Sequence, residues 1–154
     1  MSQKDDNSVK ILFRFYSNVL DKWTVETMWA TIVDKAQGLY KIDNIPFYAA
    51  VASGDTVFAE YDDNEQMVTY RHTVESSGNS TIQVVIMDKT IMTDTMIEVF
   101  TELGCGSEKY TEGYFVLDVP AEKDYKPIRE KLIALQDKKC IDFAEPCLSD
   151  NHFY

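Results

Sequence analysis

The pattern of the chain changes at residues 76–80, where the segment SSGNS separates two stretches of different character. Before it, short runs rich in β-branched and aromatic residues, such as Lys10–Tyr16 and Met67–Glu75, recur between turn-forming residues. After it, two stretches carry apolar residues at helical spacing. We therefore expect an α+β protein with a β-rich first half and an α/β second half.

The first half, residues 9–76, is predicted to form a small barrel or a curled antiparallel sheet, because its strands follow one another at the spacing such folds use. Two hairpins are expected within it. In the first, two strands flank the residues DKAQG, whose Gly38 tolerates the positive φ of a hairpin end. In the second, two strands are joined by residues 62–65, which are turn formers and charges.

The second half, residues 81–148, is predicted to be ferredoxin-like, with two helices on one face of a sheet. Thr95 and Glu98 have the spacing of a capping box for the first helix. A fourth strand is expected either from residues 107–118 or from the first half. The remaining elements are predicted in this order: a strand at 81–87, a helix at 94–103, a strand at 114–119, a helix capped by Asp124 and a strand at 141–145.

The segments outside the two halves are interpreted as a disordered leader (1–8), a connector (77–80) and a tail (149–154). The leader reads MSQKDDNS, which lacks the basic start and apolar stretch of a signal peptide. No run approaches the roughly 18 apolar residues of a membrane span. We expect a cytoplasmic protein with no membrane partner, in which the widely spaced Cys105, Cys140 and Cys147 stay reduced.

The motifs of common catalytic and cofactor sites are missing from the sequence. Only His72 and His152 are available for histidine chemistry, and neither CxxC nor HExxH occurs. No GxGxxG or GxxxxGK[ST] offers a phosphate cradle. We predict no cofactor, no metal and no enzymatic activity, with an enzyme that uses carboxylates or the thiol of Cys105 or Cys147 as a remaining alternative.

The formal charge is −11, from 26 acidic against 15 basic residues. A field of this sign repels nucleic acid and attracts basic proteins, although acidity is also a common route to solubility. We therefore expect no nucleic-acid partner and consider a basic protein instead. The candidate partner-binding residues are Asp55, Glu60, Asp62, Asp63, Glu65, Ser77 and Asn79.

Four strings taken together resemble a bacterial domain-of-unknown-function family, number 4265: DNIPFYA (43–49), GDTVFAEYD (54–62), SGNSTIQV (77–84) and DYKPIREKL (124–132). The resemblance implies a stand-alone cytoplasmic bacterial protein with a β-rich half followed by an α/β half. It brings no nucleophile, base or metal ligand to this chain. The polar residues within these strings are interpreted first as turn and cap residues.

These observations favour a non-catalytic protein-binding module, such as an acidic inhibitor or immunity-type protein that covers a basic toxin or nuclease. A small-molecule-sensing regulatory module is the alternative, because ferredoxin-like halves often bind small molecules. The sequence leaves the oligomeric state open.

Overall fold

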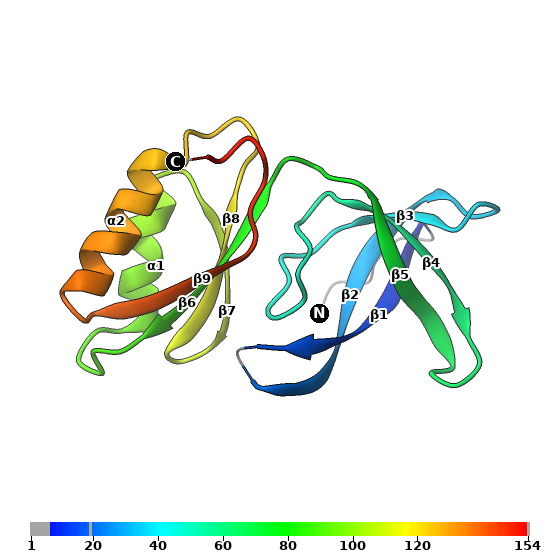
Figure 1. The fold of residues 1–154 in the computed structure, drawn as a ribbon, viewed down its shortest axis with the longest axis horizontal. Coiled ribbons are helices and arrows are strands. Elements are labelled where there is room, and N and C mark those ends of the chain that lie inside the picture. The colour runs from blue at the N-terminus through cyan, green and yellow to red at the C-terminus, as the bar shows by residue number, and fades with distance from the viewer. Residues whose placement is uncertain (1–6, 19, 154) are drawn as a thin grey trace. The chain divides into compact units, whose positions relative to one another are not determined.

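The computed structural model describes residues 7–18 and 20–153. The chain divides into two compact units, residues 1–77 and residues 78–154, at a point within the segment SSGNS. The described residues form nine strands and two helices (Figure 1). The prediction of an α+β protein is therefore confirmed.

The first unit consists of five strands. In chain order they are β1 (Ser8–Ser17), β2 (Lys22–Asp34), β3 (Leu39–Ile42), β4 (Thr56–Asp62) and β5 (Met67–Glu75). Each strand pairs with the next in antiparallel fashion. β1 also pairs with β5 in parallel, through Leu12 and Thr69, so the strand order closes on itself.

The start of the chain and the first hairpin differ from expectation in extent. Residues 1–6 of the predicted leader lie outside the described residues, and Ser8 already belongs to β1. β2 is longer than predicted because its pairing with β1 continues to Ser17 and Lys22. Gly38 has φ 74°, and a Cβ at this position would lie 2.8 Å from the carbonyl oxygen of Ala59. The β2–β3 turn therefore requires a glycine there.

The second unit is a four-stranded antiparallel sheet in the order β7-β8-β6-β9, with both helices on one face (Figure 1). The fourth strand is β7, so it comes from the segment just before β8 and not from the first half. Among the described residues, no helix combines the length and the apolar character needed to cross a membrane. The elements are β6 (Ser80–Ile86), α1 (Thr93–Glu102), β7 (Gly106–Thr111), β8 (Tyr114–Val119), α2 (Lys126–Asp137) and β9 (Ile141–Cys147).

Each helix buries one apolar stripe against the sheet. Met96 and Phe100 of α1, and Ile128 and Leu132 of α2, belong to one core with β6 and β8 residues such as Phe115. Residues three or four positions apart share a helix face, so the opposite faces of both helices remain toward solvent.

The predicted capping box of α1 is wrong. The helix begins after Met92, whose side chain makes no cap, so Thr95 and Glu98 lie inside the helix. Glu112, in the β7–β8 turn, accepts hydrogen bonds from the Thr93 N–H (2.8 Å) and the Thr93 hydroxyl (2.7 Å). The first N–H group of the helix therefore bonds to a residue from another part of the chain, where the sequence predicted a cap within the helix itself.

Candidate partner-binding groove

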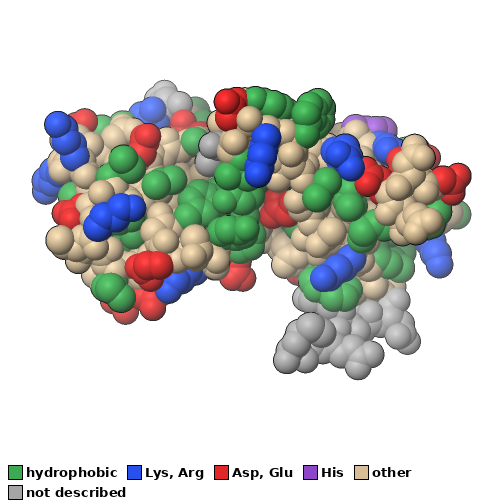
Figure 2. Space-filling view, turned by 90° about the horizontal axis from the view of Figure 1, so that it is seen from below, with side chains coloured by type: hydrophobic (Ala, Val, Ile, Leu, Met, Phe, Trp, Pro, Cys, Tyr) green, Lys and Arg blue, Asp and Glu red, His purple; other side chains and the backbone are tan. Residues whose placement is uncertain are grey.

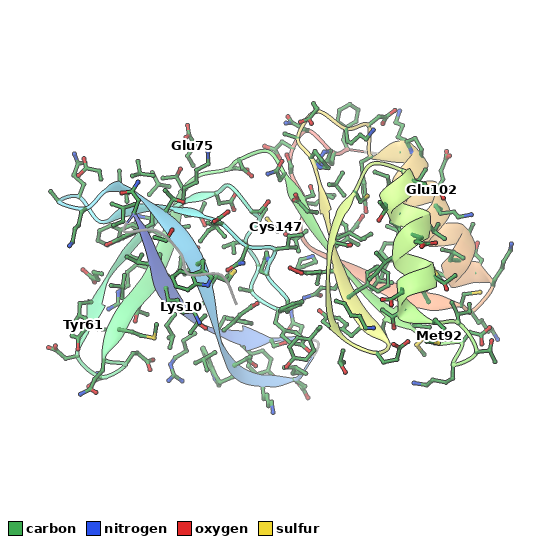
Figure 3. The ribbon with its side chains drawn as sticks, turned by 180° about the vertical axis from the view of Figure 1, so that it is seen from behind. Lys10, Tyr61, Glu75, Met92, Glu102 and Cys147 are labelled. Atoms are coloured by element: carbon green, nitrogen blue, oxygen red, sulfur yellow. The ribbon has the colours of Figure 1, made fainter. Side chains whose placement is uncertain are left out.

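The solvent face of α1 carries acidic residues and no basic one. Its charged residues are Asp94, Glu98 and Glu102, at intervals of four. Because Met96 and Phe100 point into the core, these carboxylates lie on the other side of the helix. Glu98 and Glu102 are one turn apart, about 6 Å along the axis. Glu102 occupies the last turn (Figure 3).

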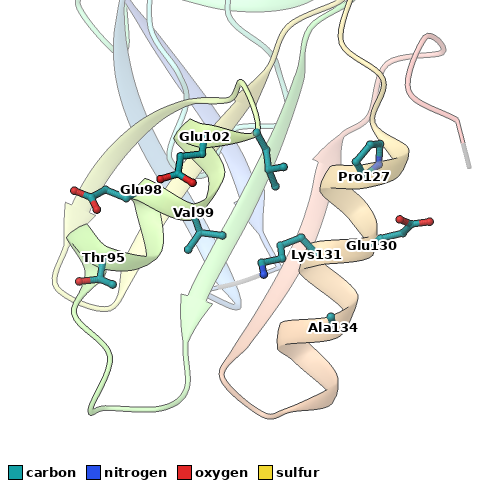
Figure 4. Close-up of a pocket in the computed structure, with 9 residues that line it drawn as sticks. Thr95, Glu98, Val99, Glu102, Pro127, Glu130, Lys131 and Ala134 are labelled. Atoms are coloured by element: carbon teal, nitrogen blue, oxygen red, sulfur yellow. The ribbon is translucent and has the colours of Figure 1, made fainter.

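α2 forms the facing wall. Pro127, Lys131 and Ala134 lie on its side toward α1, while Glu130 points away from α1 at the rim (Figure 4). Pro127, Lys131 and Ala134 form a stripe that lies next to the buried stripe of Ile128 and Leu132. The two walls therefore differ in charge on the sides that face each other, with carboxylates on α1 and the ammonium group of Lys131 on α2, while the Glu130 carboxylate lies at the outer rim.

A groove of about 750 Å³ runs between α1 and α2 and is open to solvent. Val99 and Leu103 contribute its apolar surface and also pack against the core of the unit. Small-molecule sites enclose most of their ligand, whereas an open groove with apolar surface and charged walls suits a segment of another protein.

The charged groups of the groove have no partner within the described part of the chain. Glu98, Glu102, Glu130 and Lys131 make no side-chain hydrogen bond and no ion pair with another described residue. Carboxylates at i and i+4 repel each other, and Glu102 faces the negative end of the helix dipole. α1 therefore holds excess negative charge that the described residues do not balance.

The predicted acids of β4 are already paired inside the first unit. Arg71 donates to Glu60 and to Asp62, each at 2.9 Å. The hydrogen bond from Arg71 lowers the pKa of Asp62 below its ordinary value. The Asp62 carboxylate also accepts the N–H groups of Asn64 and Glu65 in the hairpin turn, where Asp63 is exposed.

Glu65 is paired in the same way. Arg14 donates two hydrogen bonds to its carboxylate, at 2.6 and 3.2 Å, and this contact is the main cause of the lowered pKa of Glu65. Of the predicted acids in this hairpin, Glu60, Asp62 and Glu65 thus have intramolecular counter-charges. A partner would have to compete with arginines for them.

The other three candidate residues, Asp55, Ser77 and Asn79, take part in hydrogen bonds that hold loops in place. Asp55 is only 3% exposed and accepts the N–H groups of Ala52 (3.0 Å) and Ser77 (2.9 Å). Asn79 accepts the N–H of Ala121 at 2.8 Å. These contacts agree with the turn-and-cap interpretation of the polar residues. The assignment of the seven residues to partner binding stays a prediction.

His152 is the polar residue whose position the sequence did not indicate. It is fully buried between the Ser80 hydroxyl and the carbonyl of Pro120. Because both Ser80 and His152 are 0% exposed, no substrate reaches the pair from solvent in this conformation. The contact holds the end of the chain against β6.

Cys105, Cys140 and Cys147 form no disulfide bond among the described residues. Burial raises the pKa of the Cys105 thiol to about 12, with the neighbouring Asp118 acting in the same direction. Cys105 is therefore protonated at neutral pH, and a thiol is a poor nucleophile. Within the described ranges, no three His, Cys, Asp or Glu side chains converge on a metal position.

The charge of the molecule is spread rather than gathered in one unit. Residues 1–77 have 12 acidic and 7 basic residues, and residues 78–154 have 14 and 8. Acidic and basic side chains are interspersed over the face seen in Figure 2. What distinguishes the groove is therefore that its carboxylates make no ion pair with another described residue, and not a larger number of acids.

A family model described as Domain of unknown function (DUF4265) matches residues 26–143. The chain belongs to this family. The DUF4265 match begins within β2 and ends within β9, so it includes both helices that form the groove. The resemblance inferred from the four sequence strings is confirmed.

The solved structures include one similar protein, titled "Novel crystal structure of a hypothetical protein from Neisseria gonorrhoeae". Its sequence is 22% identical, the match covers 95% of this chain and 99% of that chain, and the TM-score is 0.80. This similarity shows a shared fold. No curated protein matches the chain significantly.

Proposed function

We propose that this DUF4265 protein is a protein-binding module that receives a basic protein through the groove between α1 and α2. An acidic inhibitor or immunity-type protein that covers a basic toxin or nuclease is the form of this function that we favour. The observation that carries the proposal is that Glu98 and Glu102, which make no ion pair with another described residue, lie beside the half-buried apolar side chains of Val99 and Leu103.

The electrostatics of α1 support a cationic partner. Each like-charge pair at i, i+4 costs a helix roughly 0.2–0.5 kcal/mol, and an acid in the last turn adds a cost of similar size. Lys or Arg from a partner would relieve both terms on binding. Complementary charge also speeds the encounter and helps to reject wrong partners.

The proposal includes a finer interpretation of the two units. We interpret the second as ferredoxin-like, because its order is β-α-β-β-α-β, and the first as a small barrel, because its pairing closes between β1 and β5. We also propose that the protein acts in the cytoplasm, where cysteines stay reduced, because Cys105, Cys140 and Cys147 form no disulfide bond among the described residues.

The second candidate function is the sensing of a small molecule. A cavity of about 140 Å³ in the first unit is lined by Phe13, Phe15 and Tyr70, among others, and would suit a small apolar compound. Typical ligand pockets are larger, about 300–1,000 Å³. The groove therefore supports protein binding better than this cavity supports sensing.

A capture experiment with matched variants tests the proposal. The full chain is immobilised, exposed to a lysate of its native host at low salt and eluted with salt. The groove variant E98Q/E102Q removes two charges from α1. The control variant E108Q/E122Q removes two charges from exposed side chains outside the groove.

The expected result is a basic protein that the native chain and the control retain and that the groove variant loses. Retention by all three proteins, or the absence of any basic protein at low salt, contradicts the proposal. If a compound in a metabolite screen raises the melting temperature of the chain while no protein is retained, small-molecule sensing replaces protein binding as the proposed function.

A further inference from the structure

The contacts of the groove also indicate what kind of segment occupies it, an inference that rests on the proposed function. We propose that the groove receives one amphipathic helix of the basic partner, with Lys or Arg along the edge that faces α1. Its other edge, opposite Lys131, is neutral or acidic. Its apolar seam contacts Val99 and Leu103.

The walls of the groove favour a helix over an extended segment. Both walls are α-helices, whose backbone groups along the groove are already bonded within each helix. An extended segment lying there would bury N–H and C=O groups without partners, which costs free energy for each group. A helix satisfies its own backbone and brings only side chains to the contact.

The spacing of the acids matches a helical partner. Glu98 and Glu102 are separated by one turn, about 6 Å along α1. Residues i and i+4 of a docked helix have the same separation, so two cationic side chains on one edge meet both carboxylates. Val99 and Leu103 repeat the same interval on the neighbouring stripe. Side chains at this interval form the ridges along which helices pack.

The α2 wall determines which edge of the partner helix carries the cations. Lys131 stands between Pro127 and Ala134 on the side of α2 that faces α1, whereas Glu130 points away from α1. A second row of cations on the partner would be repelled by Lys131. The groove therefore distinguishes a helix with separated charged edges from a generally cationic peptide.

Three fluorescent peptides of equal composition, each of about 18 residues so that a helix can form, test this inference with the full chain. The first has Lys at i and i+4 on one edge, a Leu and Ala seam, and Glu on the other edge. The second has the same residues with its charges scattered around the helix. The third exchanges an Ala in the middle of the first pattern with a Pro that the first two peptides carry at their N-terminus, so that a proline interrupts the helix.

We expect the first peptide to bind about tenfold more tightly than the other two, and its circular dichroism to become more helical on binding. E98Q/E102Q weakens this binding about tenfold, while E108Q/E122Q leaves it unchanged. Equal binding of the first and third peptides overturns the helical occupant. Equal binding of the first and second peptides would show that charge attraction alone causes binding, and would also overturn the helical occupant.

A charge exchange between Lys131 and the peptide tests which edge of the partner helix faces α2. The K131E substitution should weaken binding of the first peptide. Replacing the Glu edge of that peptide with Lys should restore its affinity for the K131E variant. Failure of this restoration overturns the assignment of the two edges. Thermal melts and far-ultraviolet circular dichroism verify that every variant is folded.

The outcomes separate this inference from the proposed function. If no peptide binds while capture of the basic host protein still depends on Glu98 and Glu102, the helical occupant is wrong and the protein-binding function stands. If that capture does not depend on these residues, the proposed function itself is wrong.

Discussion

His152 Nδ1 lies 2.5 Å from the hydroxyl oxygen of Ser80, a residue 72 positions earlier in the chain. His152 Nε2 is 2.9 Å from the Pro120 carbonyl, and a carbonyl only accepts, so Nε2 carries the proton and donates. A neutral ring then accepts the Ser80 hydroxyl at Nδ1. Ser80 in turn accepts the Ser149 N–H at 2.8 Å. These bonds fasten the last residues to β6.

Replacing His152 with Ala should destabilise the second unit by about 3 kcal/mol, because it empties a buried site, removes the acceptor of the Ser80 hydroxyl proton and removes one of the two N–H donors to the Pro120 carbonyl. Both helices belong to the second unit, so urea unfolding followed by circular dichroism at 222 nm reports on it. His72→Ala, at an exposed position in β5, is the control. An equal effect of the two substitutions would contradict the buried contact.

Replacing Glu26 with Ala should destabilise the first unit by about 2 kcal/mol. The Glu26 carboxylate accepts the N–H groups of Phe47, Tyr48 and Ala49, at 2.6, 3.1 and 2.9 Å, and so holds the loop between β3 and β4. Both tryptophans of the chain lie in the first unit, so their fluorescence during urea unfolding measures the effect.

The control for Glu26 is Glu75→Ala, at an exposed position in β5. Glu26→Gln should recover part of the stability, since an amide oxygen still accepts these bonds. A Gln variant as unstable as the Ala variant would show that the negative charge, and not the acceptor, is what the loop requires.

The stability of the second unit should fall in acid partly through Glu112. Hydrogen bonds from Thr93, and more weakly Lys109, lower the pKa of the Glu112 carboxyl from its ordinary value of 4.5. A carboxyl with a lowered folded-state pKa stabilises the fold above its unfolded pKa, and this contribution is lost as the pH falls through the folded pKa. The Glu112 contribution should thus be complete at neutral pH and decline below pH 4.5.

Comparison with E112Q measures this contribution. The native chain should be the more stable at pH 7, and the two stabilities should converge in acid, as monitored by urea unfolding at 222 nm. A difference between the two proteins that stays constant from neutral to acidic pH would be inconsistent with the lowered pKa.

Cys105 should react with iodoacetamide more slowly than Cys140 and Cys147. Burial raises the Cys105 pKa to about 12, whereas the other two thiols are partly exposed. Thiolate, and not thiol, is the reactive form. Peptide mapping by mass spectrometry after labelling at neutral pH gives the order of reaction. Rapid labelling of Cys105 in the folded chain would reopen its role as a nucleophile.

Much of the secondary structure could be predicted from local patterns. The helix expected at 94–103 is α1 at Thr93–Glu102, and the strand expected at 114–119 is β8. Periodicity is a local property of the chain, so a short window contains it. The α1 cap could not be predicted, because Glu112 lies 19 residues from Thr93 and meets it only when β7 and β8 pair.

The candidate site shows the same limit. The sequence directed attention to Glu60, Asp62 and Glu65 because acids cluster in that turn, yet folding brings Arg14 and Arg71 beside them. Arg14 lies 51 residues from Glu65. The four-residue interval of Asp94, Glu98 and Glu102 is present in the sequence but did not mark a site there, because only folding places the α2 wall opposite these acids.

The sequence by itself determined the α+β class, the family and the excess of negative charge. Only the tertiary structure decided which carboxylates have counter-charges and which, like Glu98 and Glu102, make no ion pair with another described residue. The physical reason is that electrostatic energy depends on separation in space and on the solvent between the groups, whereas a sequence records separation along the chain.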